Sequence, residues 1–346
     1  MGGVRDDAAG RGRSILRLFR PDDGCGVAAA DALAARVTAY YDGETGRITL
    51  PVDGDTLAPF DRVMLAHELT HSLTDAHFRW NASGNTLSAE GSTDAWYALN
   101  AVVEGDATVV QEWYAASYLD AQEQADYENA YDDELPATPA FDEAATWFTY
   151  GDGAWYVADL TDQGGLAAVN RSYTKGVPST EWVLDGPDGV GDRPVEVDAQ
   201  LSFPPVSSYL VYGGEWGTLD WYKLLWEDPG RYDDVAGLGG ASYAVYEDDL
   251  GQSLIHIRQV GDNEESVERL FSASAETLPG PMAVGTPTVD GTTLTAVGDD
   301  YLWIGRTGTE LRLIAAQDPT DGSRAVQKLL ATEAGITEGR IPDNNG

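Results

Sequence analysis

The chain has 346 residues and a formal net charge of −37, from 58 acidic and only 21 basic side chains. Hydrophobic residues make up 42% of it, enough for one large domain or two smaller ones with a real core. So acidic a chain excludes binding to DNA, RNA or anionic lipid, and its scattered carboxylates are typical of halophilic proteins, whose self-repulsion is screened by concentrated salt.

Residues 1–30 are predicted to form a lead-in, because Pro21 and nearby glycines interrupt regular structure. No signal peptide is visible in this stretch, since its arginines flank no apolar core. No run of about 18 apolar residues occurs, so we expect no transmembrane segment. The single cysteine, Cys25, excludes an internal disulfide.

Two short strands and a helix are predicted next. Residues 37–41 and 47–50 are rich in β-branched and aromatic side chains and flank a turn containing Gly, which predicts a β-hairpin. Residues 60–78 place apolar side chains at helical spacing without Gly or Pro, which predicts an α-helix. The hairpin is either an ordinary structural element or an edge to which an extended peptide adds as a strand.

The predicted helix carries the run His67-Glu68-Leu69-Thr70-His71. Residues four apart lie one turn apart on the same face, so both imidazoles can point at one zinc ion. Glu68 lies beside them and is the candidate general base for a water activated by zinc. With four histidines in the chain, this pattern is expected by chance only about 0.003 times, so an accidental surface pair is the weaker interpretation.

A catalytic zinc site needs a third protein ligand, and His77 is one candidate. Its spacing from His71 matches the metzincin pattern, but Thr74 stands where that pattern has a Gly. A β-branched residue disfavours the positive φ that the required turn needs. If the helix continues, His77 points to another face and is a helix-end histidine near the carbonyl dipoles.

Glu104 is the second candidate, on a helix predicted from Thr93 to Tyr118. Polar residues follow a 3–4 spacing on this otherwise apolar helix: Asn100, Glu104, Thr108 and Gln111. Such a stripe either faces solvent or gathers around a buried site. A carboxylate opposite two histidines completes a His₂Glu set with one position open for water, so we favour Glu104 as the third metal ligand.

The run 67–71 followed by Glu104-Gly105-Asp106-Ala107 resembles the gluzincin arrangement of zinc metallopeptidases. More narrowly, the chain resembles a little-characterised family of surface or secreted metallopeptidase-like proteins of halophilic archaea and actinobacteria. The resemblance implies Zn²⁺ as cofactor, a peptide or protein substrate, and an extracytoplasmic or cell-surface location. Many gluzincins orient a ligand histidine with an Asp four residues after the ligand Glu. Thr108 stands there in this chain, which leaves Asp106 or Thr108 as candidates for that role.

Residues 141–170 are predicted to be helical, with breaks at Gly151 and Gly153. A peptidase also needs a donor that stabilises the oxyanion, a role that Tyr fills in some zincins. Four side chains are candidates for that donor: Tyr150, Tyr156, Tyr173 and Arg171.

The chain is predicted to have an α+β fold. Residues 31–185 form a mainly helical, zincin-like domain with an N-terminal β-hairpin, 186–206 a linker, and 207–346 a smaller α+β sheet domain that includes a helix at 219–226. His256, in a predicted strand, is interpreted as structural. The predicted function is zinc-dependent peptide hydrolysis, and the alternative is a non-catalytic surface protein that keeps a zinc site for structure or binding.

Overall fold

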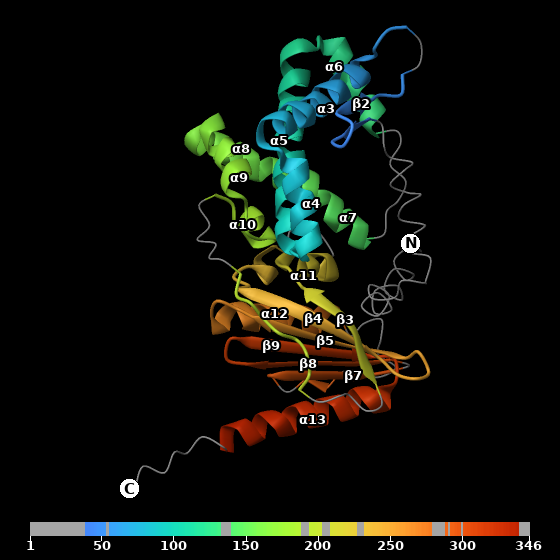
Figure 1. Ribbon diagram of the computed structural model, residues 1–346, viewed down its shortest axis with the longest axis vertical. Coiled ribbons are helices and arrows are strands. Elements are labelled where there is room, and N and C mark those ends of the chain that lie inside the picture. The colour runs from blue at the N-terminus through green and yellow to red at the C-terminus, as the bar shows by residue number, and fades with distance from the viewer. Residues whose placement is uncertain are drawn as a thin grey trace, which may run out of the picture. The chain divides into compact units, whose positions relative to one another are not determined.

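The computed structural model describes residues 39–52, 55–132, 140–187, 194–202, 208–226, 232–278, 288–289, 291–298 and 300–338. The predicted lead-in and Cys25 lie outside these residues. The fold is α+β, as predicted from the sequence (Figure 1). The described residues divide into a helical unit, within Asp22–Pro194 and Gly217–Tyr232, and a sheet unit, within Val195–Trp216 and Asp233–Gly346.

The predicted hairpin and the predicted first helix are both present in the helical unit. Strands β1 (Tyr40–Asp42) and β2 (Arg47–Thr49) pair antiparallel, and helix α3 spans Pro59–Phe78. At its start, the Asp61 carboxylate accepts a hydrogen bond from the Ala58 backbone N–H. It ends at Arg79, whose φ of 59° is left-handed. The helix therefore continues through Thr74 without the sharp turn that a metzincin site needs.

The helical unit is built around α5, which packs against α3, α4, α8, α9, α10 and η1. Small and β-branched side chains line its buried face and let neighbouring helices approach closely. Helix α5 spans Thr93–Tyr118. The other helices of this unit are α4 (Trp80–Glu90), α6 (Ala121–Asp132), α7 (Ala140–Thr146), the π-helix η1 (Trp147–Asp152), α8 (Gly153–Gly164), α9 (Leu166–Lys175), α10 (Thr180–Asp185) and α11 (Thr218–Leu225). Helix α4 includes residues 81–90, a segment whose many polar residues would also suit a loop.

The predicted helix breaks at Gly151 and Gly153 are wrong. The chain stays helical there, passing from α7 through the wider turn of η1 into α8. Gly153 serves a helix crossing instead, because a Cβ atom on it would lie 2.2 Å from the carbonyl oxygen of Ala101 in α5. The glycine is therefore needed for backbone contact between two helices and not for ending one.

Helix α11 belongs to the helical unit, although the sequence places residues 219–226 with the second domain. The reason is a buried hydrogen-bond chain. The Leu219 N–H donates to Thr180 Oγ1 over 3.0 Å, and Thr180 Oγ1 donates to Asp94 Oδ1 over 2.6 Å. These contacts tie α11 to the starts of α10 and α5, which are distant in sequence.

The sheet unit contains a seven-stranded antiparallel sheet in the order β3-β4-β5-β9-β8-β7-β6. Its elements are β3 (Tyr209–Glu215), η2 (Tyr232–Val235), β4 (Gly240–Glu247), β5 (Ser253–Val260), α12 (Glu264–Thr277), β6 (Thr288–Val289), β7 (Thr293–Val297), β8 (Tyr301–Thr307), β9 (Glu310–Ala316) and α13 (Pro319–Glu338). Helix α13 packs on the face that carries Trp303 and Ile314. Helix α12 packs on the opposite face, where Phe271 lies under Arg306. Both helices are visible on either side of the sheet in Figure 1.

Part of the predicted linker lies across this sheet. The buried His256 ring lies with Nδ1 2.6 Å from the Ala199 carbonyl oxygen, and the Leu201 N–H donates to the Tyr246 hydroxyl. Burial lowers the pKa of His256 to about 4, so the ring is neutral. His256 is thus a core residue, as expected from the sequence.

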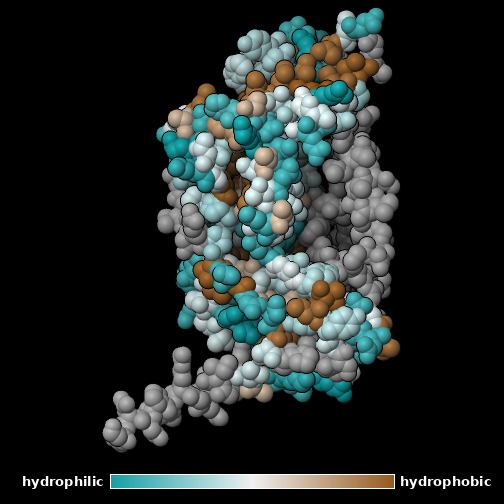
Figure 2. Space-filling view, viewed as in Figure 1, coloured by the Kyte–Doolittle hydropathy of each residue, from teal (hydrophilic) through white to brown (hydrophobic). Residues whose placement is uncertain are grey.

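No helix among the described residues has the length and apolarity needed to cross a membrane. On the face seen in Figure 2, hydrophilic residues predominate and hydrophobic residues reach the surface in separate patches.

Candidate metal centre

Three side chains from two packed helices converge inside the helical unit. His67 and His71 of α3 place their Nε2 atoms 3.0 Å apart, and the Oε2 atom of Glu104 from α5 lies 3.2 and 3.3 Å from them. Both histidines are buried and Glu104 is half-buried. Together they form a group that can hold a metal ion.

The triangle of ligand atoms fits a tetrahedral ion. Metal–ligand bonds of 2.0–2.2 Å at tetrahedral angles hold ligand atoms roughly 3.3–3.5 Å apart, close to the 3.0–3.3 Å found here. Two imidazole nitrogens and a carboxylate oxygen offer three lone pairs to one point, and a cation there would satisfy all three. The donor set leaves a fourth tetrahedral position for water.

The third member of the group, Glu104, carries a negative charge. Burial would raise the pKa of Glu104, but its contacts with the His67 and His71 rings outweigh burial and lower the pKa to about 2. Glu104 is therefore a carboxylate at neutral pH. Burial disfavours protonation of His71, yet its hydrogen bond to Glu104 raises the pKa of the ring.

Gln111 orients the first histidine, a role that sequence reasoning missed. Its Oε1 lies 3.0 Å from Nδ1 of His67, while its Nε2 donates to the Tyr127 hydroxyl over 2.9 Å. With an amide oxygen as partner, Nδ1 carries the proton and Nε2 keeps its lone pair for a metal. The sequence offered one indication of this role: Gln111 belongs to the polar stripe of α5, seven residues after Glu104.

The second histidine has a different surrounding. The Trp80 indole N–H donates to the His71 carbonyl oxygen, and the two rings lie edge to face with centroids 5.9 Å apart. His71 Nδ1 is buried and has no hydrogen-bond partner among the described residues. Asp106 acts on His71 through its charge and accepts a hydrogen bond from the Tyr173 hydroxyl over 3.0 Å.

Glu68, the candidate base, is buried directly after the first ligand histidine. Burial raises the pKa of its carboxyl group. A backbone hydrogen bond from Tyr41 reaches the same carboxylate. Strand β1 therefore lies beside the candidate base.

His77 lies away from this group. It is exposed in the last turn of α3, where its ring meets Phe78 edge to face. The metal-binding group found among the described residues does not include it. The uninterrupted helix through Thr74 explains why.

The candidate oxyanion donors are placed very differently. The Tyr150 ring lies 6.4 Å from that of His67, measured between centroids. Tyr156 is buried against Ser172, Tyr173 donates to Asp106, and Arg171 is exposed on α9. Tyr150 is the candidate next to a ligand.

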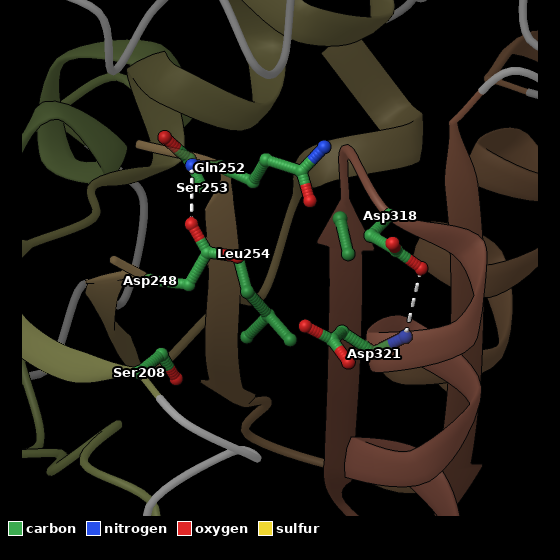
Figure 3. Close-up of a pocket in the computed structure, with 8 residues that line it drawn as sticks. Ser208, Asp248, Gln252, Ser253, Leu254, Asp318 and Asp321 are labelled. Atoms are coloured by element: carbon green, nitrogen blue, oxygen red, sulfur yellow. Dashed lines mark hydrogen bonds between the residues drawn. The ribbon is translucent and has the colours of Figure 1, made fainter. Parts of the chain in front are cut away.

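A small pocket in the sheet unit holds several carboxylates (Figure 3). Two of them cap backbone turns: Asp248 accepts from the N–H of Gln252, and Asp318 accepts from the N–H of Asp321. These carboxylates organise the chain around the pocket.

No family model, curated protein or solved structure matches the chain. The likeness to gluzincins thus rests on the residues of the site.

Proposed function

We propose that the chain is a zinc-dependent peptide hydrolase in which His67, His71 and Glu104 hold Zn²⁺ and Glu68 is the general base. The observation that carries the proposal is a buried carboxyl group, Glu68, next to a three-ligand group that leaves one position open. A metal site that serves structure alone needs no such base. The resemblance to surface proteins adds an extracytoplasmic location to the proposal.

Bound zinc supplies a water whose pKa is lowered toward neutrality. Glu68 would accept a proton from the attacking water and would pass it to the leaving amine of the peptide. Burial raises the pKa of the Glu68 carboxyl group above its usual value. Gln111 holds the His67 ring in the ligating tautomer.

Tyr150 is our choice for the donor that stabilises the oxyanion. Its ring lies beside that of the candidate ligand His67, with centroids 6.4 Å apart. A tyrosine hydroxyl can donate a hydrogen bond to a carbonyl oxygen as negative charge develops on it.

The test is Glu68→Gln, assayed for zinc content and for hydrolysis of a mixed peptide library in molar salt. The amide cannot accept a proton, so we expect hydrolysis to fall by about 10²–10⁴-fold while one zinc per chain is retained. Glu90→Gln, which changes an exposed carboxylate at the end of α4, is the control and should keep full activity. If the wild-type chain cleaves no peptide, the proposal fails in favour of a surface protein that keeps its metal for structure or binding.

A further inference from the structure

A series of hydrogen bonds connects an exposed carboxylate of α5 to the first candidate ligand. The Oε1 atom of the exposed Glu112 accepts from the Tyr127 hydroxyl over 3.1 Å and from Nε2 of Gln111 over 3.2 Å. The same Gln111 nitrogen donates to the Tyr127 hydroxyl over 2.9 Å. The Oε1 atom of Gln111 lies 3.0 Å from Nδ1 of His67. These four residues are called the Glu112 network below.

Only one direction of donation satisfies every atom of this network. As an ionised carboxylate, Glu112 can only accept hydrogen bonds. The single hydroxyl proton of Tyr127 is therefore donated to Glu112, and the hydroxyl must accept from Gln111. The NH₂ group of Gln111 faces these two acceptors, which turns its carbonyl oxygen toward His67. Because that oxygen also carries no proton, the proton between the two side chains belongs to Nδ1 of His67.

This direction decides whether His67 can bind a metal. A neutral imidazole has one proton, so a proton on Nδ1 leaves a lone pair on Nε2. Nε2 is the atom that lies 3.0 Å from Nε2 of His71 and 3.2 Å from Oε2 of Glu104. A Gln111 amide turned the other way would present its NH₂ group to Nδ1 and would favour the proton on Nε2, where it excludes a metal.

Packing holds the network in place. Tyr127 lies on α6, in a cluster whose other buried members are Val63, Met64, Ala115 and Leu119. Gln111 is also buried. Buried polar groups depend on their protein partners, so turning the Gln111 amide over would leave donors facing donors and would be costly. The exposed member, Glu112, is the one whose charge fixes the direction for the others.

We propose that Glu112 is a positioning residue for the metal centre, and that its carboxylate, through Tyr127 and Gln111, keeps the proton of the metal-free His67 ring on Nδ1. This inference rests on the metal centre of the proposed function and adds a side chain outside the ligand group that keeps one ligand ready. Such preorganisation raises affinity, because no proton has to move from Nε2 when zinc binds.

Three variants separate this role from packing and from charge. Glu112→Gln keeps the size of the side chain but offers a donor as well as an acceptor, so both directions become possible. Tyr127→Phe keeps the packed ring and removes the hydroxyl. Glu128→Gln is the matched control, because Glu128 is an exposed carboxylate directly after Tyr127 in α6 and is not a member of the network.

The experiment records the nitrogen-15 NMR shifts of the His67 ring in the zinc-free full chain at alkaline pH, where histidine rings are neutral. Zinc affinity is measured beside it by competition with a chelator, in molar salt that screens distant charges. We expect the proton on Nδ1 alone in wild-type protein and in Glu128→Gln. Glu112→Gln should populate both tautomers and bind zinc about 10-fold more weakly. Tyr127→Phe should lose less, because Glu112 still accepts directly from Gln111.

A wild-type His67 ring with its proton on Nε2 would overturn the inference, and this observation needs no variant to fold. A single Nδ1 tautomer or an unchanged zinc affinity in Glu112→Gln would overturn it too, as would an equal loss of affinity in Glu128→Gln. Hydrolysis that depends on Glu68, found with any of these results, would leave the proposed function standing. Wild-type protein that holds the proton on Nδ1 but takes up no zinc would contradict the proposed function, and with it the role of Glu112 toward a metal.

Discussion

Gly105 and Gly153 meet with their backbones in contact. A Cβ atom on Gly105 would lie 2.2 Å from the Gly153 carbonyl oxygen and 2.8 Å from the Ala154 nitrogen. Since Gly105 follows Glu104, this crossing of α5 and α8 lies directly beside the third candidate ligand. A packed interior shifts little to accept added volume. The geometry of the candidate metal centre therefore depends on glycine at both positions.

Gly105→Ala is therefore expected to cost about 1–3 kcal/mol of unfolding free energy and to weaken zinc binding, because α5 must move. Gly84→Ala is the control: Gly84 lies in α4 and its nearest neighbours to an added Cβ are 3.6 Å away. That change should be neutral or stabilising, since Ala favours a helix more than Gly. Thermal melts and zinc titrations of both variants check this, and equal behaviour would contradict the crossing argument.

Gln111→Ala should weaken zinc binding by roughly 10–100-fold, because His67 loses the partner of its Nδ1 atom. Titration against a competing chelator measures the effect. Gln122→Ala is the control, since Gln122 is exposed on α6 and bonds Asp126. Zinc affinity in Gln111→Ala equal to that of the wild type would show that the amide does not hold the ring.

Stability should depend on pH through Asp152. Burial raises its pKa from the usual 3.8 to about 7. Between these values the folded chain holds a proton that the unfolded chain has released, so this contribution is full below pH 3.8 and is lost as pH rises through about 7. At most roughly 4 kcal/mol is involved. Asp152→Asn keeps a neutral side chain, so its melting temperature relative to wild type should rise between pH 5 and 8; a constant difference would contradict the shift.

Salt should stabilise the fold, because a net charge of −37 repels itself when screening is weak. The Debye length grows from about 3 Å at 1 M to about 30 Å at 0.01 M ionic strength. We expect the melting temperature to fall between these two conditions. A melting temperature that stays level or rises would contradict a halophilic character.

Local pattern was sufficient to predict which three side chains come together as a group that could hold a metal ion. His67 and His71 are four residues apart on one helix, and Glu104 stands out as a carboxylate in a polar stripe. The contact between Gln111 and His67 Nδ1 could not be predicted in this way. It depends on how two helices pack, and residue spacing within one helix carries no information about that packing.

The role of Gly153 and the unit that contains α11 could not be predicted from the sequence. Gly153 looks like a helix breaker in isolation, yet it lies at a helix crossing whose partner, Ala101, is far away in sequence. Helix α11 likewise follows strand β3 of the sheet unit, and its hydrogen bond to Thr180 shows that it joins the helical unit. Both cases turn on long-range contacts that leave no local pattern.

A zinc titration of three proteins tests the central claim most directly. The wild-type chain and His77→Ala should each bind one zinc ion, because His77 is exposed at the end of α3 and lies outside the ligand group. Glu104→Ala should bind zinc far more weakly, because it removes the anionic member of that group. Retained zinc in Glu104→Ala together with lost zinc in His77→Ala would contradict the metal centre described here.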